Sequence, residues 1–166
     1  MPLIDSLLPE FDREMGLTRR VLERVPDGQF DFRPHPTSVT LGRLAEHLTE
    51  MPLWSTTTMT HSALEAGEQR PADYRCPSTR GEVLAQFDSC LKTARAALVN
   101  KTDAELNAPW TLTNGGKEVF TAPKATVMRN FVLNHMIHHR AQMLVYFRML
   151  GVPVPSVYGP SGDERT

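Results

Sequence analysis

Apolar residues recur at three- and four-residue steps in four long stretches of the chain, the spacing that gathers them on one face of an α-helix. The first stretch predicts a helix from about Leu3 to Val25. The second predicts a helix that starts at an N-cap, Ser38 or Thr40, and runs to about Leu64. Pro52 lies inside this second stretch and predicts a kink, because proline lacks the backbone N–H and crowds the preceding turn.

Further elements are expected in the middle of the chain. The third apolar stretch predicts a helix from Thr79 or Arg80 to Leu98. The segment from Thr102 to Glu105 has the sequence of a capping box and predicts one short helical turn. The segment from Pro109 to Pro123 holds two short runs around Asn114-Gly115, a dipeptide typical of tight β-hairpins.

The last apolar stretch predicts a helix from about Lys124 to Leu150, with Gly151 as the glycine that ends it. This helix is apolar around most of its circumference. One stripe runs from Met128 to Met149 and includes His135 and His139, and a second stripe consists of Leu133, Ile137, Ala141 and Leu144. Such a helix is central to its bundle or is covered by a partner subunit. The tail from Tyr158 to Thr166 is expected either to be poorly ordered or to dock on the helices.

Together these elements predict an all-α fold, a four-helix bundle with a small β-hairpin or loop excursion before the last long helix. A chain of 166 residues fits one domain, spanning 1–166. No internal repeat or low-complexity tract interrupts it.

Composition and charge exclude several classes of function. With 40% hydrophobic and 22% charged residues, the chain is typical of globular proteins, and its net charge of −1 creates no field that would attract nucleic acid or an anionic membrane. No apolar run approaches the roughly 20 residues that cross a bilayer, and the first residues lack the pattern of a secretory signal. The two cysteines, Cys76 and Cys90, are too few for a disulfide framework. We therefore expect a cytoplasmic protein that binds neither nucleic acid nor membranes.

The most informative chemistry lies in the histidines of the second and fourth predicted helices. His135 and His139 are one helical turn apart, so both imidazoles can reach one metal ion. His47, from the second helix, would join them if the two helices pack face to face. His138 lies about 60° from His135 around the helix and competes with His139 as a ligand. Spacing alone does not decide between them.

Three neutral imidazoles predict a divalent metal with an open coordination position, which is typical of catalytic sites. Zinc, nickel, cobalt and iron all accept such ligands. The bound ion would lower the pKa of a water molecule to about 7 or deprotonate a thiol. Gln142 lies about one turn beyond His139, where it could hold the second ring nitrogen. The alternative is that these are ordinary hydrogen-bonded core residues.

Other polar and aromatic side chains have simpler interpretations. His35 and His61 lie in polar or loop surroundings and are expected to be solvated. Arg140 and Arg148 are expected to face water or a partner chain. The large aromatic residues are expected in the core rather than around a pocket, namely Trp54, Trp110, Phe120 and Tyr146.

Two blocks of the sequence resemble the DinB/YfiT-like superfamily. Residues 32–34 (FRP) with 40–48 (TLGRLAEHL) resemble its N-terminal signature, and residues 135–142 (HMIHHRAQ) with 146–161 resemble its C-terminal signature. The resemblance covers nearly the whole chain. It implies a four-helix bundle that binds a divalent metal, often zinc or nickel, through one histidine of helix two and an H-x3-H pair of the last long helix.

Carried over residue by residue, the resemblance implies that His47, His135 and His139 are the ligands, which favours His139 over His138. The family commonly has glycine where this chain has Ala141, a small change that should not disturb the metal.

The resemblance also implies an activity, since characterised members are similar to thiol-dependent S-transferases and isomerases that use bacillithiol, mycothiol or glutathione. We therefore expect a metal-dependent transferase that activates a low-molecular-weight thiol for attack on an electrophilic small molecule, in detoxification or stress response. No residue names the electrophile, and no catalytic residue beyond the metal ligands is identified. The second apolar stripe of the last helix and the stripe of the first helix exceed what one four-helix core needs, and members of the family are often homodimers, so we expect a homodimer.

Two alternatives stay open. The metal could activate water instead of a thiol, giving a hydrolase of a small ester or amide that would ignore added thiol. The chain could also be a non-enzymatic metal-binding stress protein, in which the metal stabilises the fold without turnover.

Overall fold

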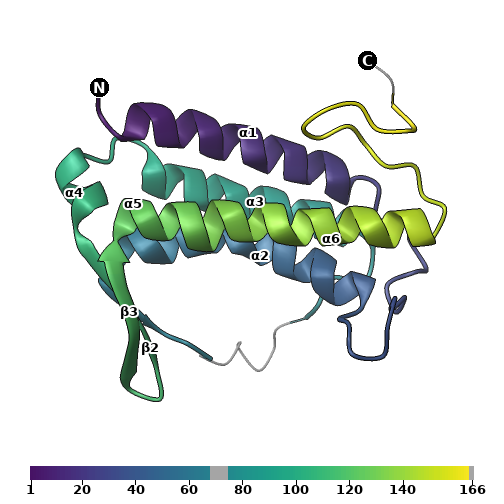
Figure 1. Ribbon diagram of the computed structural model, residues 1–166, viewed down its shortest axis with the longest axis horizontal. Coiled ribbons are helices and arrows are strands. Elements are labelled where there is room, and N and C mark those ends of the chain that lie inside the picture. Colours follow the sequence, from purple (N-terminus) through teal and green to yellow (C-terminus); the bar gives the residue numbers. More distant parts are fainter. Residues whose placement is uncertain (68–74, 165–166) are drawn as a thin grey trace.

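The computed structural model describes residues 1–67 and 75–164 and is mostly helical, with a small three-stranded sheet. Four long helical runs lie alongside one another, and the β-hairpin projects from one end of them (Figure 1). In chain order the elements are α1 Ile4–Leu22, α2 Leu41–Thr60, β1 Ala63–Glu65, α3 Arg80–Leu98, α4 Asp103–Asn107, β2 Pro109–Asn114, β3 Lys117–Pro123, α5 Lys124–Val127, the π-helix η1 Met128–Asn134 and α6 His135–Met149. The predominantly helical prediction is confirmed.

The second helix starts where the sequence predicts and ends earlier. The hydroxyl of Thr40 accepts a hydrogen bond from the backbone N–H of Arg43 at 3.1 Å, which is an N-cap. The helix continues through Pro52 to Thr60. The predicted extension to Leu64 is wrong, because the backbone turns extended at His61 (φ −118°, ψ 165°). Beyond this point the chain leaves the helix to join the sheet.

A third strand therefore accompanies the predicted hairpin. β2 and β3 pair in antiparallel fashion and meet in a two-residue turn, Gly115-Gly116, whose positive φ angles (58° and 72°) suit glycine. β1 pairs in parallel with β2, so that Leu64 lies opposite Leu112. A three-residue strand is too short for its alternation to be recognised in the sequence.

The last helical run, predicted as one regular helix, changes its winding in the middle. α5 continues directly into the π-helix η1, and α6 begins with His135. The predicted glycine end is confirmed, since Gly151 has a φ of 70° and donates its N–H to the carbonyl of Arg148 at 3.2 Å. A π-helical turn holds more residues than an α-helical turn, and such turns are frequent at functional sites.

The core lies between the long helices, and one of its members corrects a prediction. Arg140 was expected to face water or a partner, but its side chain is only 2% exposed. Its guanidinium pairs with the carboxylate of Glu14 on α1 at 2.6 Å and donates to the hydroxyl of Thr18 at 3.1 Å. Arg148 does lie at the surface, where it pairs with Asp163. Because the partner of Arg140 is 126 positions away, only the fold reveals the pair.

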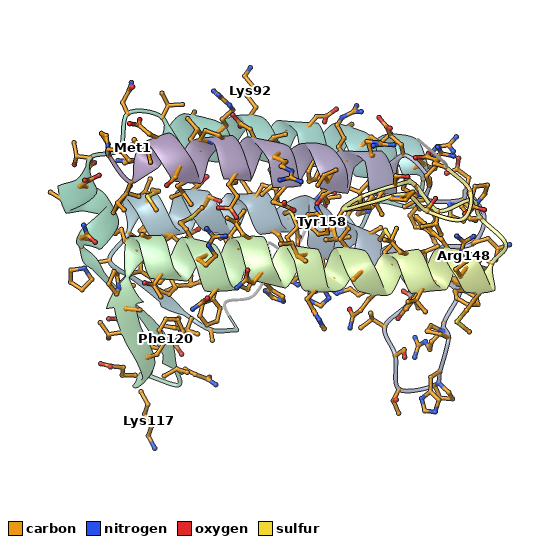
Figure 2. The ribbon with its side chains drawn as sticks, turned by 45° about the horizontal axis from the view of Figure 1, so that its top comes forward. Met1, Lys92, Lys117, Phe120, Arg148 and Tyr158 are labelled. Atoms are coloured by element: carbon orange, nitrogen blue, oxygen red, sulfur yellow. The ribbon has the colours of Figure 1, made fainter. Side chains whose placement is uncertain are left out.

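The C-terminal tail docks on the helices, which is one of the two predicted outcomes; its last two residues, 165–166, lie outside the described part of the chain. Figure 2 shows the tail folded back over the end of α1. The hydroxyl of Tyr158 donates to the carboxylate of Glu14 at 2.6 Å, and Glu164 accepts from Arg20 and Arg24. The tail thus shares its anchor with the buried Arg140.

Within residues 1–67 and 75–164, none of the helices combines the length and the apolarity that crossing a bilayer requires.

Replacing Gly42 by alanine is expected to lower the free energy of unfolding by about 1–3 kcal/mol. A Cβ there would lie 2.9 Å from Cδ1 of Phe30 and 3.1 Å from its carbonyl oxygen, which the N–H of Gly42 already holds at 2.8 Å. The matched control is Gly16→Ala on the exposed face of α1, where a Cβ meets nothing within 4 Å. That variant should gain about 0.5–1 kcal/mol. Urea unfolding followed by circular dichroism compares them, and equal effects would contradict the tight approach.

Candidate metal centre

Three histidines from two helices meet at one point of the fold. His47 comes from α2, while His135 and His139 lie one turn apart at the start of α6. Their rings are close, with centroids 4.6 Å apart for His47–His139, 5.2 Å for His47–His135 and 4.6 Å for His135–His139. One nitrogen of each ring can be chosen so that all three lie within 4.8 Å of one another. The structure therefore brings together the three residues that the sequence singles out.

The ring of His139 is held in a defined orientation. Its Nδ1 lies 2.8 Å from the amide oxygen of Gln142, which can only accept a hydrogen bond, so Nδ1 carries the proton in this arrangement. The lone pair of the neutral ring is then on Nε2, which lies 2.7 Å from Nε2 of His135. Gln142 thus takes the position predicted for it, and Nε2 faces the other imidazoles. A partner that fixes the tautomer in this way is typical of metal-binding histidines.

The exposed neighbour His138 does not belong to this cluster. Its ring stands beside that of His139, with centroids 5.0 Å apart, but the side chain lines an adjoining pocket. The geometry therefore favours His139, as the family resemblance does and the helical spacing alone does not. His35 and His61 are exposed and hydrogen-bonded to neighbouring threonines, as expected.

Partial burial favours the uncharged form of two of the imidazoles. Burial lowers the pKa of His135, and the nearby His139 and His138 lower it further. The pKa of His139 is also lowered, chiefly by burial; the hydrogen bond that its Nδ1–H donates to Gln142 partly opposes this shift. A lowered pKa means that the lone pairs stay available at neutral pH, as metal binding requires.

The stability of the metal-free protein is expected to fall as the pH is lowered through about 6.5, the pKa of an unperturbed imidazole. Because His135 and His139 have lowered pKa values in the folded protein, the unfolded chain binds protons first. Stability therefore rises with pH, is fully present above the unfolded pKa and is lost as the pH falls through the folded pKa values. Chemical denaturation with a chelator present measures this dependence. A His135→Ala/His139→Ala double variant should show a flatter profile, and an unchanged profile would contradict the assignment.

The three-imidazole donor set fits a borderline ion such as zinc or nickel better than calcium or magnesium, which prefer oxygen ligands. Among the described residues, the group that could hold an ion comprises these three histidines. Three protein ligands leave room for a further ligand from solution. The cluster is thus compatible with a divalent metal.

A pocket of about 790 Å³ adjoins the cluster. It shares His135 with the cluster, and the ring of Trp54 lies 5.5 Å from that of His135. The pocket is lined by Trp54, Leu64, Glu65, Ala66, Gly67, Trp110, Leu112, Asn130, Phe131, Asn134, His135 and His138. Its residues come from α2, the strands β1 and β2 with the turn after β1, and the last helical run.

The pocket corrects the interpretation of two aromatic residues. Trp110 is buried in the core as expected and Trp54 is half-buried, but both also line a pocket, which the sequence did not predict. Tyr146 belongs to the core as expected, with its hydroxyl donating to the carbonyl of Val39. Phe120 stacks on Phe131, with centroids 4.7 Å apart.

Sequence reasoning also missed the polar residues of the pocket, Asn130 and Asn134. The two asparagines lie four residues apart in the last helical run, and with His138 they continue a polar series at four-residue steps. That series was the available signal, on an otherwise apolar segment.

Comparisons with known proteins agree with this fold. The model of the DinB family matches residues 2–166. YrdA of Bacillus subtilis strain 168, an uncharacterized protein, is 26% identical over 162 residues, which cover 97% of this chain and 91% of YrdA.

Two solved structures resemble the fold. A DinB-like protein from Bacillus cereus ATCC 10987 has a TM-score of 0.71 at 24% identity, with 95% of this chain and 98% of that chain covered. The DinB-like protein YjoA from Bacillus subtilis has a TM-score of 0.67 at 18% identity, with 96% and 99% covered. At these identities the likeness concerns the fold alone. Because the family model extends over nearly the whole sequence, the chain belongs to the DinB family.

Proposed function

We propose that this chain binds a divalent metal, zinc or nickel, through His47, His135 and His139 and uses it to activate a low-molecular-weight thiol. The activated thiol attacks an electrophilic small molecule held in the adjoining pocket. The observation that carries the proposal is the meeting of three imidazoles at one point beside a pocket of about 790 Å³. A four-helix bundle forming one domain is the scaffold that we propose for this site.

In this proposal the residues of the cluster bind the metal and the residues of the pocket bind the substrate. When bound, the metal supplies a Lewis-acidic position that lowers the pKa of a coordinated thiol from about 8.5. Gln142 holds the tautomer of His139 in which Nε2 faces the cluster. The ring of Trp54 packs against His47 and His135 and also lines the pocket, so the metal site and the pocket share this side chain. In the transfer the thiol sulfur forms the new bond to carbon, its proton passes to solvent and the leaving group departs with the electron pair.

The deciding experiment is a metal analysis followed by a thiol-dependent assay. Protein purified without added metal or a histidine tag should contain about one equivalent of zinc or nickel per chain. Turnover of electrophiles should require bacillithiol, mycothiol or glutathione and should disappear with a chelator. Turnover of esters or amides that ignores the thiol would favour the hydrolase alternative. Metal-dependent stabilisation without turnover would favour a non-enzymatic metal-binding stress protein.

A cytoplasmic role in detoxification or stress response follows from this proposal. Low-molecular-weight thiols are kept reduced in that compartment.

We also propose that the protein forms a homodimer through the outer face of α6. Val145 and Met149, one turn apart on this face, are 58% and 57% exposed. Burying such a pair on a second copy removes apolar surface from water. Light scattering at micromolar concentration should give twice the monomer mass. The variant Val145→Lys/Met149→Lys should give the monomer mass, while Val119→Lys on the hairpin should remain dimeric. A monomeric wild-type protein would overturn the proposal.

A further inference from the structure

Three aromatic rings line the pocket beside the histidine cluster. Trp54 comes from α2, Trp110 from β2 and Phe131 from η1. Phe120 supports two of these rings from behind, lying 4.7 Å from Phe131 in a stacked arrangement and 6.1 Å from Trp110. Figure 2 shows Phe120 on the hairpin, which brings this support from outside the helical part of the molecule. Packing against Phe120 therefore restrains Phe131 and Trp110 from collapsing into the pocket.

The charged side chains of the described pocket lining disfavour an anionic ligand. Among the described residues around the pocket, Glu65 is the one with a formal charge at neutral pH, and no lysine or arginine is found there. Hydrogen bonds from Thr113 and the backbone of Gly116 and Gly115 lower the pKa of Glu65, so it stays ionised. A substrate carboxylate, sulfonate or phosphate would lie near the ionised Glu65, would find no lysine or arginine among these described lining residues to pair with, and would lose hydration.

The remaining polar groups suit an uncharged ligand. Asn130 and Asn134 offer amide donors and acceptors at the pocket, with the two side chains 3.5 Å apart. Neutral amides orient polar substituents such as carbonyl or nitro groups without requiring a charge. The volume of about 790 Å³ lies within the range of small-molecule sites.

We infer that this pocket takes an uncharged aromatic small molecule, and that this class of compound is the electrophile of the proposed reaction. Stacking on the indole of Trp54 and the ring of Phe131 provides the binding surface. The pocket also includes the metal-side histidine His135, which places such a ring next to the cluster. The inference rests on the proposed function only where it identifies the ligand as a substrate.

A binding experiment can test the ligand class without any reaction. The chain has two tryptophans, and both line this pocket, so energy transfer from tryptophan to a bound dye reports its occupancy. N-phenyl-1-naphthylamine is uncharged, and 8-anilinonaphthalene-1-sulfonate adds one negative charge to the same rings. We expect the uncharged dye to bind at least about tenfold more tightly.

Two variants show whether the difference arises from this pocket. Leu112→Lys adds a cation to the wall and should strengthen binding of the sulfonate while weakening binding of the uncharged dye. Val119→Lys adds the same charge on β3, where Val119 is 56% exposed and outside the lining, and should change neither. Equal affinities of the two dyes for the wild-type protein, or equal effects of the two lysines, would overturn the inference.

The test separates this inference from the metal-dependent reaction. His47 and His139 do not line the pocket, so the variant His47→Ala/His139→Ala should retain the dye preference and lose thiol-dependent turnover. Dye preference in a wild-type protein without thiol-dependent turnover would overturn the proposed function and support the ligand class.

A turnover assay compares an uncharged electrophile, 4-chloro-3-nitrobenzamide, with an anionic one, 4-chloro-3-nitrobenzoate. The thiolate forms a bond to the ring carbon and chloride leaves with the electron pair. After division by the uncatalysed rate with the same thiol, kcat/KM should be at least about tenfold higher for the amide. A preference for the benzoate would overturn the inference and leave thiol transfer in place.

Discussion

Replacing His139 by alanine is expected to weaken divalent-metal binding by more than about 100-fold. Losing a residue that only hydrogen-bonds a metal ligand already costs up to about 100-fold in affinity, and losing the ligand itself should cost more. His139 presents Nε2 to the cluster, and its ring centroid is 4.6 Å from both His47 and His135. Its loss leaves two imidazoles, which cannot hold the ion as a three-ligand site does. Thiol-dependent turnover should therefore disappear. Competition with a fluorescent chelator measures the affinity, and the assay with added thiol measures the turnover.

The matched control is His138→Ala, which removes the same side chain one position earlier. His138 is exposed and lies outside the cluster, so metal affinity should change little. Circular dichroism of both metal-free variants checks that the helices are intact. If His138→Ala lost the metal while His139→Ala kept it, the ligand assignment would be wrong and the helical spacing would have to be interpreted the other way.

The second large effect concerns stability rather than the metal. Arg140→Leu is expected to lower the free energy of unfolding by about 3–5 kcal/mol, because it leaves a buried carboxylate without its charge partner. The side chains of Arg140 and Glu14 are 2% and 5% exposed, and the pair is joined by the hydroxyl groups of Thr18 and Tyr158. Urea unfolding of the metal-free protein gives the value without a contribution from metal binding.

Two further variants distinguish the buried pair from an ordinary ion pair. Arg148→Leu removes an arginine that also pairs with a carboxylate, that of Asp163, but its side chain is 50% exposed. That loss should cost at most about 1 kcal/mol. Glu14→Leu/Arg140→Leu replaces both charges by apolar groups and should recover most of the stability. Equal losses for Arg140→Leu and Arg148→Leu would show that the buried network contributes little.

The sequence predicted several helix boundaries well because each of these boundaries has a local signal. Thr40, one of the two predicted N-caps, caps α2, and the capping box of Thr102 and Glu105 is formed. Helix α3 begins at Arg80, one of its two predicted starts, with Thr79 as its N-cap, and Gly151 ends α6. In each case the residues that determine the boundary lie within a few positions of it. Local hydrogen-bonding rules are enough for such features.

Three of the misses share the opposite property, since each depends on a partner far along the chain. Leu64 leaves the helical pattern because Leu112 offers a strand to pair with. Arg140 is buried because Glu14 meets it from α1. Trp54 lines a pocket because the hairpin stands opposite it. Helical periodicity carries no information about these meetings.

The candidate site falls between these two cases. The separation of His135 and His139 along one helix was readable from spacing, whereas the approach of His47 required the packing of α2 against the last helical run. The family resemblance supplied the choice of His139, and the structure gives it a physical basis in the contact with Gln142.

The π-helix η1 separates two α-helical segments, α5 and α6, of the last helical run. Asn130 and Phe131, which line the pocket, lie inside it, and His135 is the first residue beyond it. An insertion or deletion of one residue in this stretch can be absorbed by exchanging π for α winding, instead of unfolding the helix. Such a change would rotate the pocket wall against the histidine cluster. Relatives that differ in length here would then hold the same histidine cluster beside a pocket of different shape. A pocket of different shape would accept different small molecules while the rest of the fold stays unchanged.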